Sequence, residues 1–169
     1  MNSELQTMMT ACEGRYPTRA EQAMLRDWAA RLEGRLAAVA EIQSREDAIV
    51  GQAVDEVLRA YPDLEKRIKD ARRSCMRDVS LVLRYNSLAL LRGDPQWLED
   101  SLLTWMATVL RGVGFARAFV SDTYTILTRS AARELSPSVM EQLRPFLDLT
   151  VVALAGKQEP AAVGKEAVA

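Results

Sequence analysis

The chain has 169 residues, which is enough for one domain with a buried core. Its 22 lysines and arginines almost balance 23 aspartates and glutamates, so the net charge gives no reason to expect a nucleic-acid partner. No stretch approaches the roughly 20 apolar residues that cross a bilayer, and the first residues lack the basic start and apolar centre of a signal peptide. We therefore expect a cytoplasmic protein with no membrane span.

Cysteine and histidine usage narrows the possible chemistry. The two cysteines, Cys12 and Cys75, are too few for a disulfide framework or a four-thiolate metal site. Histidine is absent, which excludes Ser-His and Cys-His catalysis, most zinc sites and a histidine-ligated haem. We expect a protein that is not an enzyme and that carries neither haem nor a metal ion.

Apolar residues recur at helical spacing in every segment, and no segment shows the sustained alternation of a strand. In the first predicted helix, which ends near Gly14, Leu5, Met8 and Met9 form a stripe that a partner protein would cover. This stripe is a candidate interaction surface.

Two further helices are predicted before residue 62. Thr18 and Glu21 form a capping box for the second helix, which should bend or break at Gly34. Ser44 looks like the start of a third helix, and Pro62 ends it.

The longest uninterrupted pattern runs over residues 72–94 and predicts one helix closed by a glycine. Asp94 and Pro95 are a suitable N-cap and first residue for the next helix. The last helix should begin at Ser136, and Pro145 should kink it because proline lacks the backbone N–H donor.

The pattern as a whole predicts an all-α domain of about seven or eight helices over residues 1–156. Residues 157–169, rich in alanine, glutamate, lysine and glycine, are expected to be frayed or disordered. The tryptophans Trp28, Trp97 and Trp105 lie at helical spacing among aliphatic residues, which favours core packing.

Residues of the central helix separate into faces when they are placed at about 100° per position. Its apolar arc consists of Ala71, Cys75, Val79, Val82, Leu83 and Ala89. Arg73, Arg77 and Arg84 lie on another side, and Asp78 and Tyr85 lie at the border of the arc.

This arrangement has two interpretations. A carboxylate beside an apolar cleft can accept hydrogen bonds from pyrrole-type N–H groups, a cysteine one turn away can tether a ligand as a thioether, and arginines can fork onto ligand carboxylates. The alternative is that Cys75 is a small core residue and that the charged positions form ordinary ion pairs on a solvated face. Spacing alone favours the second interpretation.

A family resemblance favours the first. The segment 73–78, Arg-Ser-Cys-Met-Arg-Asp, resembles the attachment segment of phycobiliproteins, in which the bilin-linked cysteine is followed by X-Arg-Asp. The resemblance extends over most of the chain to about residue 155. Its other matching segments are Gly14–Tyr16, Ala48–Pro62, Leu83–Tyr85, Gly93–Asp94 and Phe146–Asp148.

The resemblance implies a globin-like fold with an N-terminal helical pair and a linear tetrapyrrole as cofactor, either a phycocyanobilin-like or a biliverdin-derived bilin. It implies that Cys75 is the thioether attachment point and that Asp78 binds the central pyrrole nitrogens. Arg77 and Arg73 would pair with the propionates, and Tyr85 would pack near the pigment. It also implies homo- or hetero-oligomers that form through the N-terminal helices and the Arg84 region.

The chain also departs from the family pattern. Only residues 63–74 separate Pro62 from Cys75, which is shorter than the connection that walls the pigment pocket in light-harvesting subunits. Ala11 stands where an N-terminal acid usually meets the partner subunit. These departures indicate a divergent member, such as a bilin-biosynthesis-associated globin, that acts as chromophore protein or bilin carrier. The alternative is a non-pigmented protein-interaction or sensor module.

Overall fold

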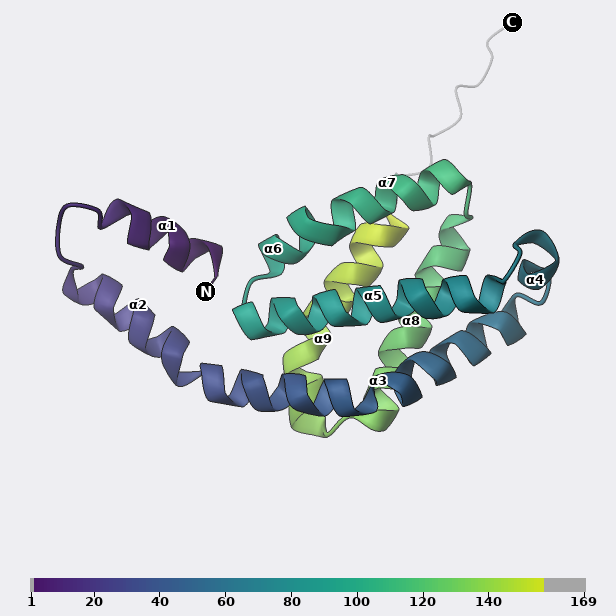
Figure 1. Ribbon diagram of the computed structural model, residues 1–169, viewed down its shortest axis with the longest axis horizontal. Coiled ribbons are helices and arrows are strands. Elements are labelled where there is room, and N and C mark those ends of the chain that lie inside the picture. Colours follow the sequence, from purple (N-terminus) through teal and green to yellow (C-terminus); the bar gives the residue numbers. More distant parts are fainter. Residues whose placement is uncertain (1, 157–169) are drawn as a thin grey trace, which may run out of the picture.

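The computed structural model describes residues 2–156, and these residues form helices joined by short connections (Figure 1). The helices are α1 (Ser3–Ala11), α2 (Arg19–Ala30), α3 (Leu32–Ala60), α4 (Leu64–Arg67), α5 (Ala71–Arg92), α6 (Pro95–Leu98), a π-helical segment (Glu99–Leu103), α7 (Thr104–Val113), α8 (Arg117–Glu134) and α9 (Pro137–Ala155). No strand occurs in this part of the chain. The all-α, globin-like fold is confirmed, whereas the expectation for residues 157–169 lies outside the described residues.

Seven helices longer than one turn lie within residues 2–156, as predicted, and two single-turn helices, α4 and α6, lie in the connections on either side of α5. None of the helices within residues 2–156 is long and apolar enough to cross a membrane.

The body of the molecule is built on α3, which packs against both α5 and α8, while α9 packs against α8 and α5. Large, fully buried side chains come from all of these helices, from α6 and from the π-helical segment: Ile49, Leu83, Leu90, Leu98, Leu102, Leu127, Leu143 and Leu147. This packing buries one face of α5 and leaves the opposite face in solvent.

One polar pair lies inside this apolar core. Asn86 of α5 and Thr150 of α9 are both fully buried. The Thr150 hydroxyl donates to Asn86 Oδ1 at 3.1 Å, and Asn86 Nδ2 donates to the Val82 carbonyl at 2.8 Å. Because each buried polar group has a partner, the pair fixes how α9 lies on α5.

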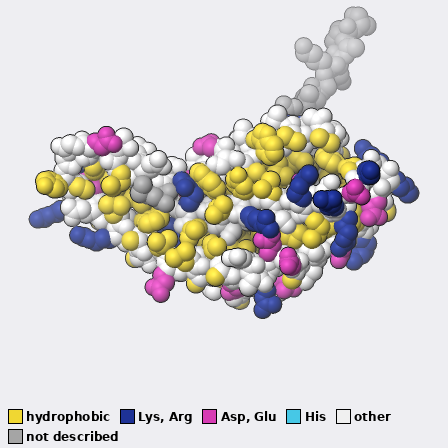
Figure 2. Space-filling model, viewed as in Figure 1, with side chains coloured by type: hydrophobic (Ala, Val, Ile, Leu, Met, Phe, Trp, Pro, Cys, Tyr) yellow, Lys and Arg dark blue, Asp and Glu magenta, His cyan; other side chains and the backbone are white. Residues whose placement is uncertain are grey.

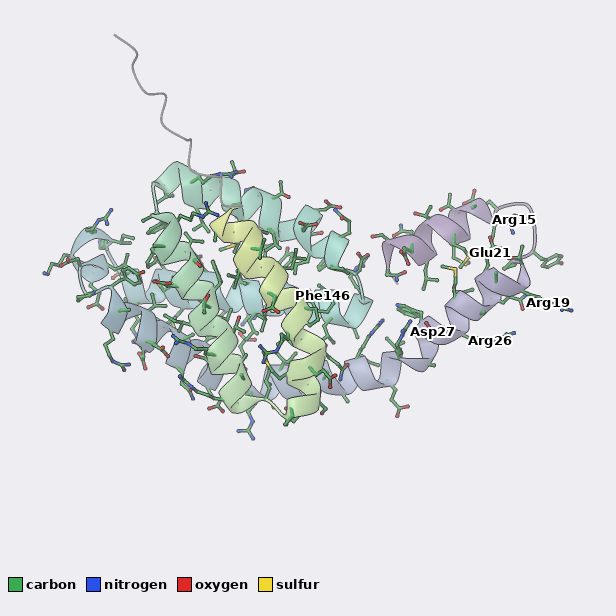
Figure 3. The ribbon with its side chains drawn as sticks, turned by 180° about the vertical axis from the view of Figure 1, so that it is seen from behind. Arg15, Arg19, Glu21, Arg26, Asp27 and Phe146 are labelled. Carbon is green, nitrogen blue, oxygen red and sulfur yellow. The ribbon has the colours of Figure 1, made fainter. Side chains whose placement is uncertain are left out.

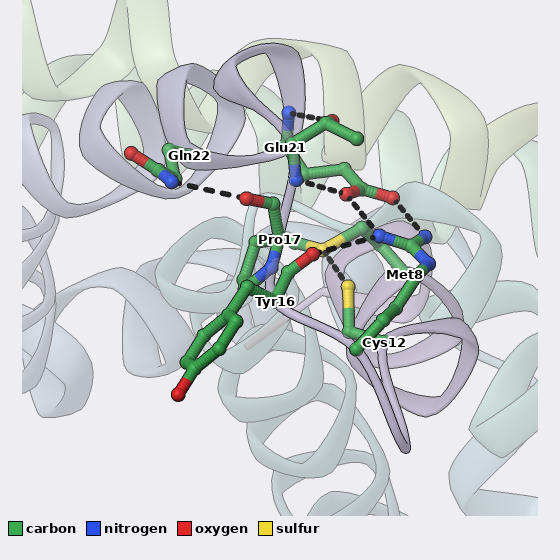
Figure 4. A network of polar contacts seen from close by, with 8 residues as sticks. Met8, Cys12, Tyr16, Pro17, Glu21 and Gln22 are labelled. Atoms are coloured by element: carbon green, nitrogen blue, oxygen red, sulfur yellow. Dashed lines mark hydrogen bonds and ion pairs between the residues drawn. The ribbon is translucent and has the colours of Figure 1, made fainter.

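The N-terminal helices α1 and α2 form a hairpin that stands out at one end of the body (Figure 1). The predicted capping box is present at Thr18 and Glu21. The Arg15 guanidinium forks onto the Glu21 carboxylate at 2.9 and 2.7 Å, which closes the turn between the two helices (Figure 4). The hydrogen bond from Arg15 holds the pKa of Glu21 well below its usual range.

The predicted interaction stripe on α1 is largely wrong. Leu5 and Met8 are buried against Leu25 and Trp28 of α2, and only Met9 of the stripe is exposed. The hairpin covers this face itself because the turn brings the apolar side of α2 onto it.

The prediction of separate helices around Gly34 and Ser44 is also wrong. The helical break falls at Arg31, and α3 then continues without interruption through both positions. The Ser44 hydroxyl donates to the Glu41 carbonyl at 2.8 Å instead of capping a helix. Packing overrides the local start signal, because Ile42 and Ile49 on either side are both buried in one core.

The helix α9 begins directly after Ser136, as the sequence predicts, and it continues through Pro145 to Ala155. The predicted core role of the tryptophans is wrong for Trp105, which is 59% exposed, whereas Trp28 and Trp97 are half-buried. No described helix covers the side of α7 on which Trp105 lies.

Candidate functional site

The helix α5 presents the two faces that its spacing predicts. Val79, Val82 and Leu83 are buried in the core, and Cys75 at the edge of the same arc is half-buried. The arginines of the other face, Arg73, Arg77 and Arg84, are all exposed. Figure 2 shows lysine and arginine side chains along this side of the molecule.

The short connection before α5 lies directly beside the cysteine. Asp70 starts α5 with a left-handed backbone, φ 55°, which aspartate tolerates better than most residues. Leu64 is buried and Ile68 is half-buried, and both side chains line a cavity at Cys75. The connection therefore places two aliphatic side chains next to the thiol.

The cavity has a volume of about 60 Å³ and is lined by Cys75 and Asp78 from α5. Phe119, Thr123 and Tyr124 of α8 form another part of its wall. Pockets that enclose a small-molecule ligand measure roughly 300–1,000 Å³. The cavity can therefore receive only a small part of a ligand while α4 keeps this position.

Tyr124 is a site residue that the sequence analysis missed. It is almost fully buried, and its hydroxyl has the weak acceptor Met106 Sδ at 3.9 Å. Burial raises the pKa of Tyr124, and the nearby Asp78 and Cys75 raise it further, so the phenol stays protonated. Its helical spacing on α8 indicates a core position, but only the packing of α8 on α5 brings it to the cysteine.

Asp78 lies at the rim of the cavity with 38% of its side chain exposed. Its Oδ1 accepts from Arg77 Nε at 2.8 Å, and this hydrogen bond raises the pKa of Arg77. The carboxylate keeps further lone pairs for donors that approach from solvent.

The Cys75 thiol has a raised pKa. Burial is the main cause, and the negative charge of Asp78 adds to it. The reactive thiolate is therefore a smaller fraction of Cys75 at neutral pH than of an exposed cysteine, since thiol reactivity follows the thiolate.

The structure does not bring all the predicted site residues together. Arg73 is exposed and Tyr85 is half-buried, but neither lines the cavity. Tyr85 stacks on Trp97 with ring centroids 5.6 Å apart. The Arg92 guanidinium lies over the Trp97 ring, with its Cζ 4.9 Å from the ring centroid. Tyr85 therefore belongs to an aromatic cluster where α5 meets α6.

An apolar stripe on α7 accompanies the site. Trp105, Val109 and Val113 are 59%, 41% and 63% exposed, and their spacing of four residues places them on one side of the helix. Figure 2 shows hydrophobic side chains gathered over α7 on the face that also carries α5. Leu110 and Phe115 continue from this region into the cavity wall.

Arg84, which the sequence analysis placed at an oligomer contact, forms an ion pair within the chain. Its Nη2 lies 2.6 Å from Glu46 Oε1 of α3. The hydrogen bond to Glu46 raises the pKa of Arg84.

Comparison with known protein families gives one match that covers most of the chain. The model of the family described as "Phycobilisome protein" matches residues 10–154. This range includes the entire cavity wall and all the predicted site residues.

Individual relatives are distant but nearly full-length. The chain is 25% identical over 148 residues to the allophycocyanin alpha-B chain of Cyanophora paradoxa, which covers 85% of this chain and 91% of the relative. It is 25% identical over 163 residues to the C-phycoerythrin class 1 subunit alpha of Synechococcus sp. (strain WH7803), covering 91% and 99%. The allophycocyanin beta chain of Mastigocladus laminosus is 28% identical over 141 residues, covering 80% and 87%.

Proposed function

The chain belongs to the phycobilisome protein family, and on that premise we propose that it binds a linear tetrapyrrole on the face formed by α5 and α7. The ligand is a phycocyanobilin-like or biliverdin-derived bilin. The protein acts as a chromophore protein or bilin carrier and not as an enzyme, and it works in the cytoplasm as an oligomer.

One observation carries the proposal: a half-buried thiol and a half-exposed carboxylate lie together at the mouth of an apolar cavity. Cys75 and Asp78 are one turn apart on α5 and line the same cavity. The exposed apolar stripe on α7 and the exposed arginines of α5 lie on this side of the molecule (Figure 2). An amphipathic ligand with acidic side chains needs both kinds of surface.

The residues fit a bilin that lies across the mouth of the cavity. A cavity of about 60 Å³ does not enclose such a ligand, so most of the ligand rests on the exposed α7 stripe. Asp78 would hold the pyrrole N–H groups, Arg77 and Arg73 the carboxylates, and Cys75 the tether. When bound, the bilin supplies visible absorption.

The raised pKa of Cys75 bears on how the tether forms. Because little thiolate is present at neutral pH, attachment is slow unless another protein assists it. Recognition beside Asp78 does not depend on the thiolate, so noncovalent binding precedes or replaces attachment.

Co-expression with a bilin supply tests the proposal. We expect native absorption from bound bilin, and fluorescence that stays with the chain on a denaturing gel if Cys75 is attached. Cys75→Ala should abolish the gel signal and keep native absorption, whereas Asp78→Asn should weaken both. Cys12→Ala is the matched control, because this buried cysteine lies in the hairpin and not at the cavity. Absence of any bilin in the wild-type protein refutes the proposal.

A second candidate is a non-pigmented interaction module, and the small cavity favours it. Leu64 and Ile68 occupy the position beside the thiol. If these side chains exclude a bilin, the wild-type protein stays colourless while a variant with Leu64→Ala and Ile68→Ala binds bilin. If the wild type and the double variant both bind bilin, the connection before α5 moves aside for the ligand, and the bilin-binding function is supported.

The oligomer can be tested separately. Leu36 of α3 and Leu88 of α5 are 51% and 45% exposed, near where the hairpin leaves the body. We expect Leu36→Lys and Leu88→Lys to lower the molar mass measured by light scattering, whereas the exposed Val152→Lys on α9 should not.

A further inference from the structure

A groove lies where α2 turns into α3, and it is separate from the Cys75 cavity. Its volume is about 440 Å³, within the range of small-molecule pockets. Arg31 and Arg35 of this elbow, Leu90 and Gly93 of α5, and Phe146 of α9 contribute to its wall. Figure 3 shows Phe146 on α9 and Asp27 on the neighbouring part of α2.

The Arg35 guanidinium lies directly against Gly93. A Cβ atom placed on Gly93 would be 2.5 Å from both Nη1 and Nη2, so the guanidinium lies where the side chain of a larger residue would begin. Nη1 is buried and donates to no acceptor. A buried guanidinium N–H without an acceptor is unfavourable, because its hydration is lost and nothing replaces it.

Three backbone carbonyls at the end of α5 already accept hydrogen bonds. The end of α5 is a Schellman turn, in which Asp94 N donates to the Ala89 carbonyl and Gly93 N to the Leu90 carbonyl, both at 3.0 Å. The Arg92 carbonyl accepts from Trp28 Nε1 at 3.1 Å. Arg35 lies at this end of the helix, and its Nη1 donates to none of these three carbonyls.

No acid forms an ion pair with Arg35 in the part of the chain that the structure describes. Among residues 2–156, no aspartate or glutamate lines the groove. The nearby Asp27 pairs with Arg31. Burial lowers the pKa of Arg35 and repulsion from Arg31 lowers it further, while the negative charge of Asp27 offsets only part of this lowering.

We propose that this groove binds an oxyanion, a carboxylate or phosphate group of a small molecule, through the Arg35 guanidinium. A guanidinium fork matches the two oxygens of such a group. Leu90 and Phe146 add apolar wall, so an oxyanion on an apolar body fits better than a bare one. The unpaired cation is then a binding group kept at the expense of stability in the free protein.

Oxyanion binding by Arg35 can be tested by thermal unfolding and titration calorimetry. The ligands are benzoate, acetate and inorganic phosphate, each compared with chloride at the same ionic strength. Benzoate or phosphate should raise Tm above the chloride control. Arg35→Met should weaken the affinity about 10- to 100-fold, because a charge-assisted hydrogen bond is lost, and should leave the Tm of the free protein unchanged or higher. Arg26→Met is the matched control, since Arg26 is exposed on α2 outside the groove.

Comparing the three anions shows whether the groove prefers a carboxylate or a phosphate group. A larger effect of benzoate than of acetate or phosphate identifies a carboxylate on an apolar body, and a larger effect of phosphate identifies a phosphate group. An anion effect that is absent, or that is equal in wild type and Arg35→Met, overturns the proposal. If Arg35→Met fails to fold, Arg35→Lys keeps the charge without the fork and should show the same weakened binding.

Discussion

Ser3 and Asp94 are 91 residues apart, and their contact joins the N-terminal hairpin to the body. The Ser3 backbone N–H and its hydroxyl both donate to Asp94 Oδ2 at 2.6 Å. The other oxygen of Asp94 accepts from Trp97 N at 2.9 Å and so caps α6. One carboxylate therefore serves the first turns of two helices.

Asp94→Ala should lower the free energy of unfolding by about 1–3 kcal/mol, since it removes an N-cap and leaves the Ser3 donors unpaired. Denaturant unfolding measures this loss, and hydrogen exchange should show that α1 opens more readily. Asp100→Ala is the control, because Asp100 is exposed and its carboxylate accepts a hydrogen bond from the exposed side chain of Gln96. Equal effects of the two substitutions would contradict the double role of Asp94.

The Asp94 carboxylate should also make the stability of the fold depend on pH. Burial by itself raises the pKa of Asp94, but the hydrogen bonds from Ser3 and Trp97 outweigh burial, so the pKa lies below its usual value. The pKa of Asp94 is therefore lower in the folded chain than in the unfolded chain, where it is about 3.9. The ionised carboxylate stabilises the fold at pH values above the unfolded pKa. This stabilisation is lost as the pH falls through the lower pKa of the folded chain.

We therefore expect wild type to be more stable than Asp94→Asn at pH 7, with the difference shrinking in acid. Unfolding of both proteins over a pH series measures it. A difference that grows as the pH falls contradicts the assignment.

Thr150→Val tests the buried polar pair. The substitution keeps the shape of the side chain but leaves Asn86 Oδ1 without its donor in a fully buried place. We expect a loss of about 1–3 kcal/mol in unfolding free energy. Thr125→Val on the exposed side of α8 is the matched control and should change stability by less than about 0.5 kcal/mol. A neutral Thr150→Val would mean that the pair contributes nothing to the packing of α9.

Asp78→Asn should make Cys75 more reactive. Removing the negative charge lowers the pKa of the thiol, so alkylation by iodoacetamide below that pKa should speed up by about two- to tenfold. The measurement uses a Cys12→Ala background so that only Cys75 reacts. Asp63→Asn removes an exposed acid in the connection before α5 and should leave the rate unchanged. A slower reaction in Asp78→Asn would show that Asp78 assists the thiol instead of suppressing its ionisation.

The sequence by itself determined the features that depend on neighbours along one helix. The capping box at Thr18, the Asp94 cap, and the arc that places Cys75 beside Asp78 all follow from fixed helical geometry, because residues three or four apart share one face wherever the helix packs. The attachment-like segment 73–78 also indicated the family that the comparison confirmed.

Only the tertiary structure decided how the helices meet. It made α3 continuous through Ser44, left Trp105 in solvent, brought Tyr124 to Cys75, and set Arg35 against Gly93. Each of these outcomes depends on which apolar faces cover one another, and that choice is made by burial summed over the whole core. Local periodicity shows that a face is apolar, but the partner that buries it, and the space left between them, are properties of the packed chain.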